Sequence, residues 1–178
     1  MQVVLSKTSL GIIRKLSYTF PSADLRSLYY SLIHPYFEYC NIARRSSETV
    51  FFHKLLSNQK KALRLIDGQR INSHAALIFK TYNILNLSDI NVLRSACFMY
   101  EAVNLEIPSM SNHHFVHNHF TRKSTDVHII QCRLKVCVES IKFRGPRSWN
   151  SIDLHVRLSK SICIFKRKYK SYLLGQYL

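Results

Sequence analysis

The stretch Ser47–Gly68, SETVFFHKLLSNQKKALRLIDG, predicts an amphipathic helix from about Glu48 to Asp67. Ser47 is a candidate N-cap, and Gly68 suits the position that follows a helix end. Apolar residues recur at helical spacing on one side, which we expect to be the inner side: Phe51, Leu55, Ala62, Leu63 and Ile66. Three basic residues face outward in the same register: Lys60, Lys61 and Arg64.

Two helical patterns precede this stretch. The first carries its apolar face at Leu5, Ile12, Ile13 and Leu16. The second begins after Pro21, and we expect Pro35 to kink or break it before the pattern resumes over 36–42. Its apolar residues are Leu25, Leu28, Tyr29, Leu32 and Ile33.

Three more helical patterns follow it, so the fold class is mainly α. Ser73 opens a short helix in SHAALIFKTYNIL. Ser88 and Asp89 open a longer one that Pro108 closes, with a buried stripe at Ile90, Leu93, Cys97, Tyr100 and Val103. The last spans about Lys160 to Leu174 and has an inner stripe at Phe165, Tyr169, Tyr172 and Leu173.

A small β element is expected between these last two helices. In Ser140–Ile152, SIKFRGPRSWNSI, apolar and basic residues alternate over 141–144, which predicts a strand that could pair with 129–138 as a hairpin. Gly145 and Pro146 predict a turn, and Trp149 returns a large apolar surface, so these three residues are expected to form a structural corner. Because residues 109–128 are polar and His-rich, we predict two regions, 1–108 and 109–178.

The charge is strongly basic and uneven. The net charge is +16, yet residues 71–110 carry −1, so the excess lies on either side of a near-neutral middle. Such a chain favours a polyanionic partner, with nucleic acid first and an anionic membrane surface or an acidic protein as alternatives. No apolar run is long enough to span a membrane and no signal peptide is evident, so an intracellular, cytoplasmic or nuclear location without membrane binding is expected.

The sequence offers little for metal or catalytic chemistry. Four histidines at 113, 114, 117 and 119 precede Cys132 and Cys137, but their spacing matches no common zinc site, so neither metal nor cofactor is expected. The four glycines are isolated, which excludes a glycine-rich phosphate loop. No two acidic residues are adjacent, and nucleotidyl transfer needs carboxylates that hold two metal ions, so we expect no enzymatic activity from the chain on its own.

Seven blocks of the chain follow one another in an order that a known family shares. LRSLYYSLIHPYFEYCNIA (25–43) resembles the "L..LY.SLI.PYL.YC" block of non-LTR (LINE, jockey-like) retrotransposon reverse transcriptases, and LLSNQKKALRLIDG (55–68) resembles their "L..LQKKAIRII.G" block. IFKTYNILNLSDI (78–90), FMYEAVN (98–104) and HNHFTRK (117–123) stand where related motifs are common. SIKFRGPRSWNSI resembles "SI.Y.GP.LWN.LP", and FKRKYKSYLL (165–174) resembles "FKK.LK..LL".

This resemblance covers nearly the whole chain and implies a helical, thumb-like bundle with a C-terminal region that ends in a basic helix. It implies that the catalytic palm with its Asp pair would lie upstream of Met1. Arg45 and Asp153 depart from the family pattern, which usually has Trp-Gly and proline there.

The function that this resemblance implies is that of a fragment or remnant of an RNA-directed DNA polymerase. It would hold element RNA or a template–primer duplex through phosphates, without sequence preference. The alternatives are a translated fossil without function and a domesticated module that docks an acidic protein. The residues expected to contact nucleic acid are Lys60, Lys61, Arg64, Arg122, Lys123, Lys142, Arg144, Arg147, Lys166, Arg167, Lys168 and Lys170.

Overall fold

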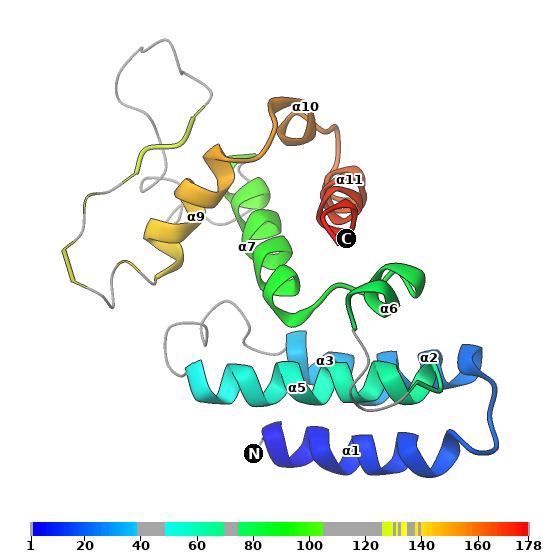
Figure 1. Cartoon of the computed structure of the whole chain (residues 1–178). Helices are drawn as coiled ribbons and strands as arrows, with labels where there is room; N and C mark the ends of the chain where they lie inside the picture. The colour runs from blue at the N-terminus through cyan, green and yellow to red at the C-terminus, as the bar shows by residue number, and fades with distance from the viewer. Residues whose placement is uncertain are drawn as a thin grey trace. The chain divides into compact units, whose positions relative to one another are not determined.

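The computed structural model describes residues 2–38, 49–69, 75–104, 126–129, 131, 133–134, 138 and 140–177, leaving out the side chains of 2–6, 49 and 51. Within these residues it holds nine helices and no strand, which confirms the mainly α class (Figure 1). The helices are α1 (Gln2–Leu16), α2 (Ser22–Leu32), α3 (His34–Glu38), α5 (Thr49–Ile66), α6 (Ala76–Thr81), α7 (Leu87–Val103), α9 (Ile141–Asn150), α10 (Leu154–Arg157) and α11 (Ile162–Gly175).

The described residues form two compact units. The first contains those up to residue 90 together with 172–177, and the second contains those in 91–171. The boundary predicted at residue 108 lies outside the described residues.

The first unit is built around α5. Figure 1 shows α1 and α5 side by side, and α2 and α6 also contact α5. The predicted helix over 48–67 is confirmed as α5, with Ala62, Leu63 and Ile66 buried as expected. Gly68 adopts a φ of 68°, and the N–H of Gln69 donates to the Arg64 carbonyl at 3.0 Å, the bond typical of a glycine-ended helix.

A buried amide holds the centre of this unit together. Gln59 is fully buried, and its Nε2 donates to the Tyr29 hydroxyl at 3.0 Å and to the Leu85 carbonyl at 2.9 Å. Its Oε1 accepts from the N–H of Leu87 at 2.8 Å. These bonds connect α5 to α2 and to the start of α7, and they satisfy an amide whose burial would otherwise be costly.

Several helix boundaries follow the sequence, and some details differ. The break at Pro35 is confirmed, because α2 ends at Leu32 and α3 begins at His34. The N-terminus of α7 was predicted wrongly at Ser88: Asn86 is the capping residue, and its Oδ1 accepts from the N–H of Asp89 at 2.9 Å. Three residues assigned to buried stripes are exposed: Ile12 (43%), Val103 (41%) and Tyr172 (58%).

In the second unit the predicted strand and turn are wrong, because residues 141–150 form helix α9. Four alternating residues are too few to separate a strand period from a helical one, and the buried residues Gly145, Pro146 and Trp149 share one helical face. Gly145 allows a close approach rather than a positive φ: a Cβ there would lie 2.6 Å from the Met99 Sδ. The described residues of the second predicted strand, 129–138, are not in a strand either.

Trp149 is buried, as predicted, but its neighbours are the aromatic residues of α7 and α11. Its ring lies 6.3 Å from that of Tyr100 and 5.6 Å from that of Phe165, while Tyr100 and Phe165 stack at 4.9 Å. The Tyr100 hydroxyl donates to the Ser159 carbonyl at 2.6 Å. This aromatic cluster is the core of the second unit and fixes α9 against α7 and α11.

Asn150 ties the segment 126–129 to the end of α9. Its Nδ2 donates to the Val127 carbonyl and its Oδ1 accepts from the Val127 N–H, both at 2.9 Å. Arg157 of α10 holds the same segment through an ion pair of 3.0 Å with Asp126. The chain after α9 therefore anchors a segment that has no secondary structure of its own.

Candidate nucleic-acid interface

The basic residues predicted to contact nucleic acid fall on three helices. Ten of them are described: Lys60, Lys61 and Arg64 on α5, Lys142, Arg144 and Arg147 on α9, and Lys166, Arg167, Lys168 and Lys170 on α11. Arg122 and Lys123 lie outside the described residues. The α5 group belongs to the first unit, and the other two belong to the second.

Helix α11 separates apolar from basic residues. Phe165, Tyr169 and Leu173 are buried, whereas Lys166 and Arg167 are exposed. Lys168 and Lys170 are half-buried, at the sides of the helix. The sequence of α11 contains no acidic residue, so its basic side is not neutralised from within the helix.

A basic residue of α7 acts on the same buried thiol as Lys166 of α11. Burial raises the pKa of the Cys97 thiol above its ordinary value, and the positive charges of Lys166 and Arg94 oppose that rise. The negative charge of Glu101 adds to the rise of this pKa, so cations and a carboxylate both act on Cys97. Arg94 was not among the residues predicted from the sequence, because it sits between the apolar residues of the α7 stripe and shows no cluster of its own.

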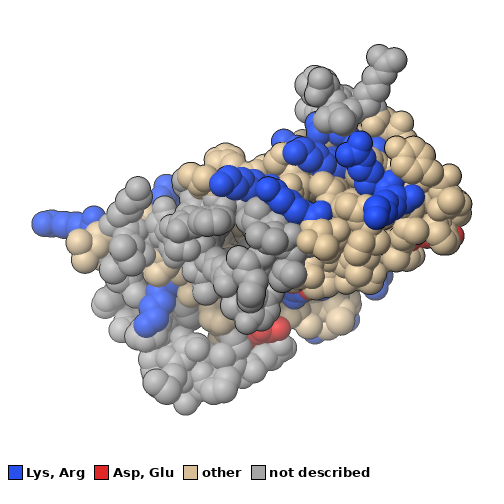
Figure 2. Space-filling view, turned by 90° about the horizontal axis from the view of Figure 1, so that it is seen from below, with Lys and Arg blue, Asp and Glu red and all other residues tan. Residues whose placement is uncertain are grey.

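The first unit also has more exposed cations than predicted. Lys61 of α5 is exposed, while Lys60 and Arg64 are half-buried. On the neighbouring helix α1, Lys7, Arg14 and Lys15 are all exposed, although the sequence interpretation did not single them out. Figure 2 views the molecule from the α1 side, and Lys and Arg side chains gather on that face while few acidic side chains are visible.

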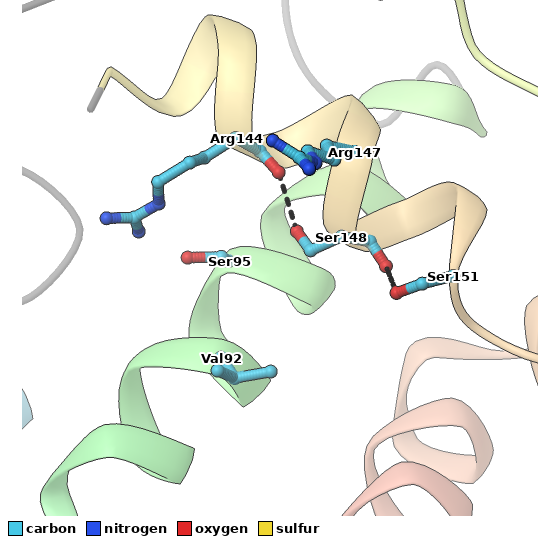
Figure 3. A pocket seen from close by; sticks show the side chains of 6 residues that line it. All are labelled: Val92, Ser95, Arg144, Arg147, Ser148 and Ser151. Carbon is cyan, nitrogen blue, oxygen red and sulfur yellow. Dashed lines mark hydrogen bonds between the residues drawn. The ribbon is translucent and has the colours of Figure 1, made fainter. Parts of the chain in front are cut away.

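On α9, two of the predicted cations line a pocket of about 310 Å³ between α7 and α9. Figure 3 shows Arg144 and Arg147 above it on α9, with Val92 and Ser95 below on α7. Ser148 Oγ donates to the Arg144 carbonyl at 2.8 Å, and Ser151 Oγ donates to the Ser148 carbonyl at 2.7 Å. Lys142, the third predicted cation of α9, is exposed but does not line the pocket.

Ser95 is the member of this pocket that sequence reasoning missed. It is 4% exposed, and its Oγ has no hydrogen-bond partner among the described residues. One signal was present in the sequence: Asn91 and Ser95 place two polar residues four apart, on one side of a helix that also carries the apolar stripe.

Three acidic residues near these elements have structural partners. Asp126 pairs with Arg157, Asp67 accepts from the Tyr82 hydroxyl at 2.9 Å, and Asp89 accepts from the Tyr177 hydroxyl. The described part of the chain contains no group of three or more His, Cys, Asp or Glu side chains that could hold a metal ion. The histidines at 113–119 and the residues Cys132 and Cys137 lie outside that part.

Comparison with protein-family models, with curated proteins and with solved structures found no match to this chain. No helix among the described residues is both long and apolar enough to cross a membrane. The arrangement of charged side chains is therefore the basis for assigning a function.

Proposed function

We propose that this chain binds nucleic acid through its phosphates, without sequence preference, and that it is a fragment or remnant of the C-terminal part of a non-LTR retrotransposon reverse transcriptase. The basic side of α11 carries the binding proposal. Lys166 and Arg167 are exposed, and Lys168 and Lys170 are half-buried at the sides, on a helix that buries an apolar stripe and has no acidic residue. A row of cations on a packed helix can neutralise successive phosphates and release their counterions.

The origin as a polymerase fragment is supported by the order of the seven sequence blocks and by the mainly helical architecture. A thumb holds the template–primer duplex by its backbone, so a basic helical bundle suits that role. Catalysis would require the palm, and we expect no nucleotide incorporation by this chain with primed template and Mg²⁺. A decayed or in-frame palm encoded upstream in the genome would support this origin, whereas a promoter with introns would favour a domesticated gene.

The binding proposal is tested by fluorescence anisotropy with duplex and single-stranded oligonucleotides over a range of salt concentrations. If about six phosphates are neutralised, log K should fall against log salt with a slope near −5 on a duplex and near −4 on a single strand. Changing Lys166, Arg167, Lys168 and Lys170 together to Gln should flatten the duplex slope by about two to four units.

A control variant with the same charge change separates a local site from the general charge. Replacing Lys7, Arg14, Lys15 and Arg26 with Gln also removes four cations, in this case exposed residues of α1 and α2. We expect the duplex slope of this control to change by about one unit or less. Equal flattening by both variants would contradict a role for α11. Absence of binding at low salt, by protein that circular dichroism shows to be folded, would refute the binding proposal itself.

A further inference from the structure

We propose that the pocket between α7 and α9 is a binding site for a single phosphate group that carries two negative charges. Such a group occurs as inorganic phosphate, as a nucleoside monophosphate or as the terminal phosphate of a nucleic-acid strand. The ligands from the protein would be the guanidinium groups of Arg144 and Arg147 and the hydroxyl of Ser95. This inference does not depend on the basic side of α11, since a free phosphate monoester is a sufficient ligand.

The two arginines are placed to act on one ligand. They lie three residues apart on α9, so they share one side of the helix, and both line the same pocket. In Figure 3 the Arg144 side chain and the Ser95 hydroxyl point to the same side, while Arg147 lies farther along α9, above Ser148. Among the described residues, the other lining residues are Val92 and three serines. Two neighbouring guanidinium groups favour a dianion, and guanidinium groups match phosphate oxygens in pairs.

Ser95 provides the second reason to expect a ligand here. The hydroxyl protons of Ser148 and Ser151 are already donated to backbone carbonyls, so these two residues have no proton to offer an anion. The Ser95 hydroxyl has no partner among the described residues, although the residue is almost fully buried. Buried polar groups are nearly always hydrogen-bonded, and a phosphate oxygen would supply the missing acceptor. Because the Ser95 Oγ is covered in the ligand-free protein, we expect the long arginine side chains to move as the phosphate enters.

The size of the pocket fits this class of ligand. A volume of about 310 Å³ is at the lower end of the range for small-molecule sites. It exceeds the space that a single phosphate group needs, so part of an ester substituent can enter with it. Arg147 lines the pocket and is exposed, which allows the rest of a nucleotide or strand to remain in solvent.

Isothermal titration with inorganic phosphate and with adenosine 5′-monophosphate tests the site directly, with adenosine as the uncharged control. Replacing Arg144 and Arg147 together with Gln should weaken phosphate binding about tenfold or more, because two charge-assisted contacts are lost. A matched control, Lys142→Gln with Lys160→Gln, removes two exposed cations of the same unit that do not line the pocket. We expect the control to change the affinity by about twofold or less.

Ser95→Ala distinguishes a ligand contact from a structural role. If the hydroxyl serves the phosphate, this variant should weaken binding by about fivefold while its melting temperature stays the same or rises, since an unpaired buried hydroxyl is removed. Oligonucleotides with and without a 5′-phosphate identify the source of the ligand. An advantage of the phosphorylated strand that disappears in the arginine variant indicates a strand end, and binding of the free compounds alone indicates a small molecule.

Two results would overturn the proposal. One is the absence of saturable binding of inorganic phosphate or the monophosphate by the folded protein. The other is equal affinity in the wild type, the arginine variant and Ser95→Ala. Neither result alters the salt dependence expected from α11, and a failure of that salt dependence leaves this titration unaffected, so the two proposals can fail separately.

Discussion

Replacing Gly145 with Ala tests the packing of α9 against α7. An ideal Cβ at this position would lie 2.6 Å from the Met99 Sδ and 3.2 Å from the Met99 Cγ. Both atoms belong to the middle of a side chain that is fully buried, so Met99 can yield only by moving within a packed core. Overpacking of this kind costs about 1–3 kcal/mol, while Ala in place of Gly inside a helix gains about 0.5–1 kcal/mol. The net expectation is a loss of about 0.5–2 kcal/mol of unfolding free energy.

Urea denaturation followed by circular dichroism measures this difference, and two further variants isolate its cause. Met99→Ala alone should cost about 2–5 kcal/mol, because it leaves a cavity. In the Met99→Ala background the obstacle is gone, so Gly145→Ala should then stabilise the protein by about 0.5–1 kcal/mol. The change of sign corresponds to a coupling free energy of about 1–3 kcal/mol between the two positions.

Gly11 offers a matched control in α1. It is exposed, lies inside a helix, and has no atom within 4 Å of an added Cβ. Gly11→Ala should therefore stabilise the protein by up to about 1 kcal/mol from helix propensity alone. The reasoning would be refuted if Gly145→Ala stabilised the wild-type protein as Gly11→Ala does, since α9 could not then press against Met99 as described.

Three other predictions concern the aromatic cluster, the buried phenols and the thiols. Trp149→Ala should lower the unfolding free energy by about 3–5 kcal/mol, measured by urea denaturation, and an unchanged midpoint would show that the indole is not packed. Burial raises the pKa of Tyr29 and of Tyr177 above the ordinary value of 10.0, so the folded state holds these protons more tightly than the unfolded state. The contribution of these residues to the unfolding free energy should therefore be fully present below pH 10 and be lost as the pH rises above it. Thermal melts across that range should show a less steep loss in Tyr29→Phe. Iodoacetamide should label exposed Cys163 well before Cys97, whose buried thiol has a raised pKa, and peptide mass spectrometry would detect the reverse order.

The long helices could be predicted because their signals are local. Helix α5 buries the apolar positions that its sequence spacing indicates, and Gly68 ends it with a positive φ. Pro35 separates α2 from α3 because a proline has no N–H to donate to the carbonyl four residues earlier, which is again a property of the local sequence. The end of α11 was placed almost as closely, since its apolar residues recur with a helical period.

Helix α9 could not be predicted in the same way, because the residue that explains it is distant in sequence. Gly145 and Pro146 are typical of a turn, and Ile141 and Phe143 alternate with cations as in a strand. The glycine in this helix is explained by Met99 of α7, which lies so close to position 145 that no Cβ atom fits there without a shift. Pro146 lies inside α9, where it removes the hydrogen bond that the Lys142 carbonyl would otherwise accept.

The candidate site was predictable as a set of charges but not as a place. Arg144 and Arg147 were identified as basic residues, as any cation in so basic a chain would be. Their convergence on one pocket depends on how α9 crosses α7, and the sequence does not contain that angle. The same limit applies to Arg94, because its action on Cys97 together with Lys166 depends on the packing of α7 against α11.

Two buried polar residues show how a fold requirement can be separated from a ligand requirement. Gln59 has a partner for each of its polar atoms, and these partners connect three segments of the first unit, so its polarity is explained by the fold. Ser95 is buried to a similar degree, yet nothing in the described part of the second unit bonds its hydroxyl. A hydroxyl without a partner weakens the folded state, so the fold alone gives no reason for a serine where an alanine would pack. Its position beneath two arginines supplies that reason if the missing partner is an anion from outside the chain.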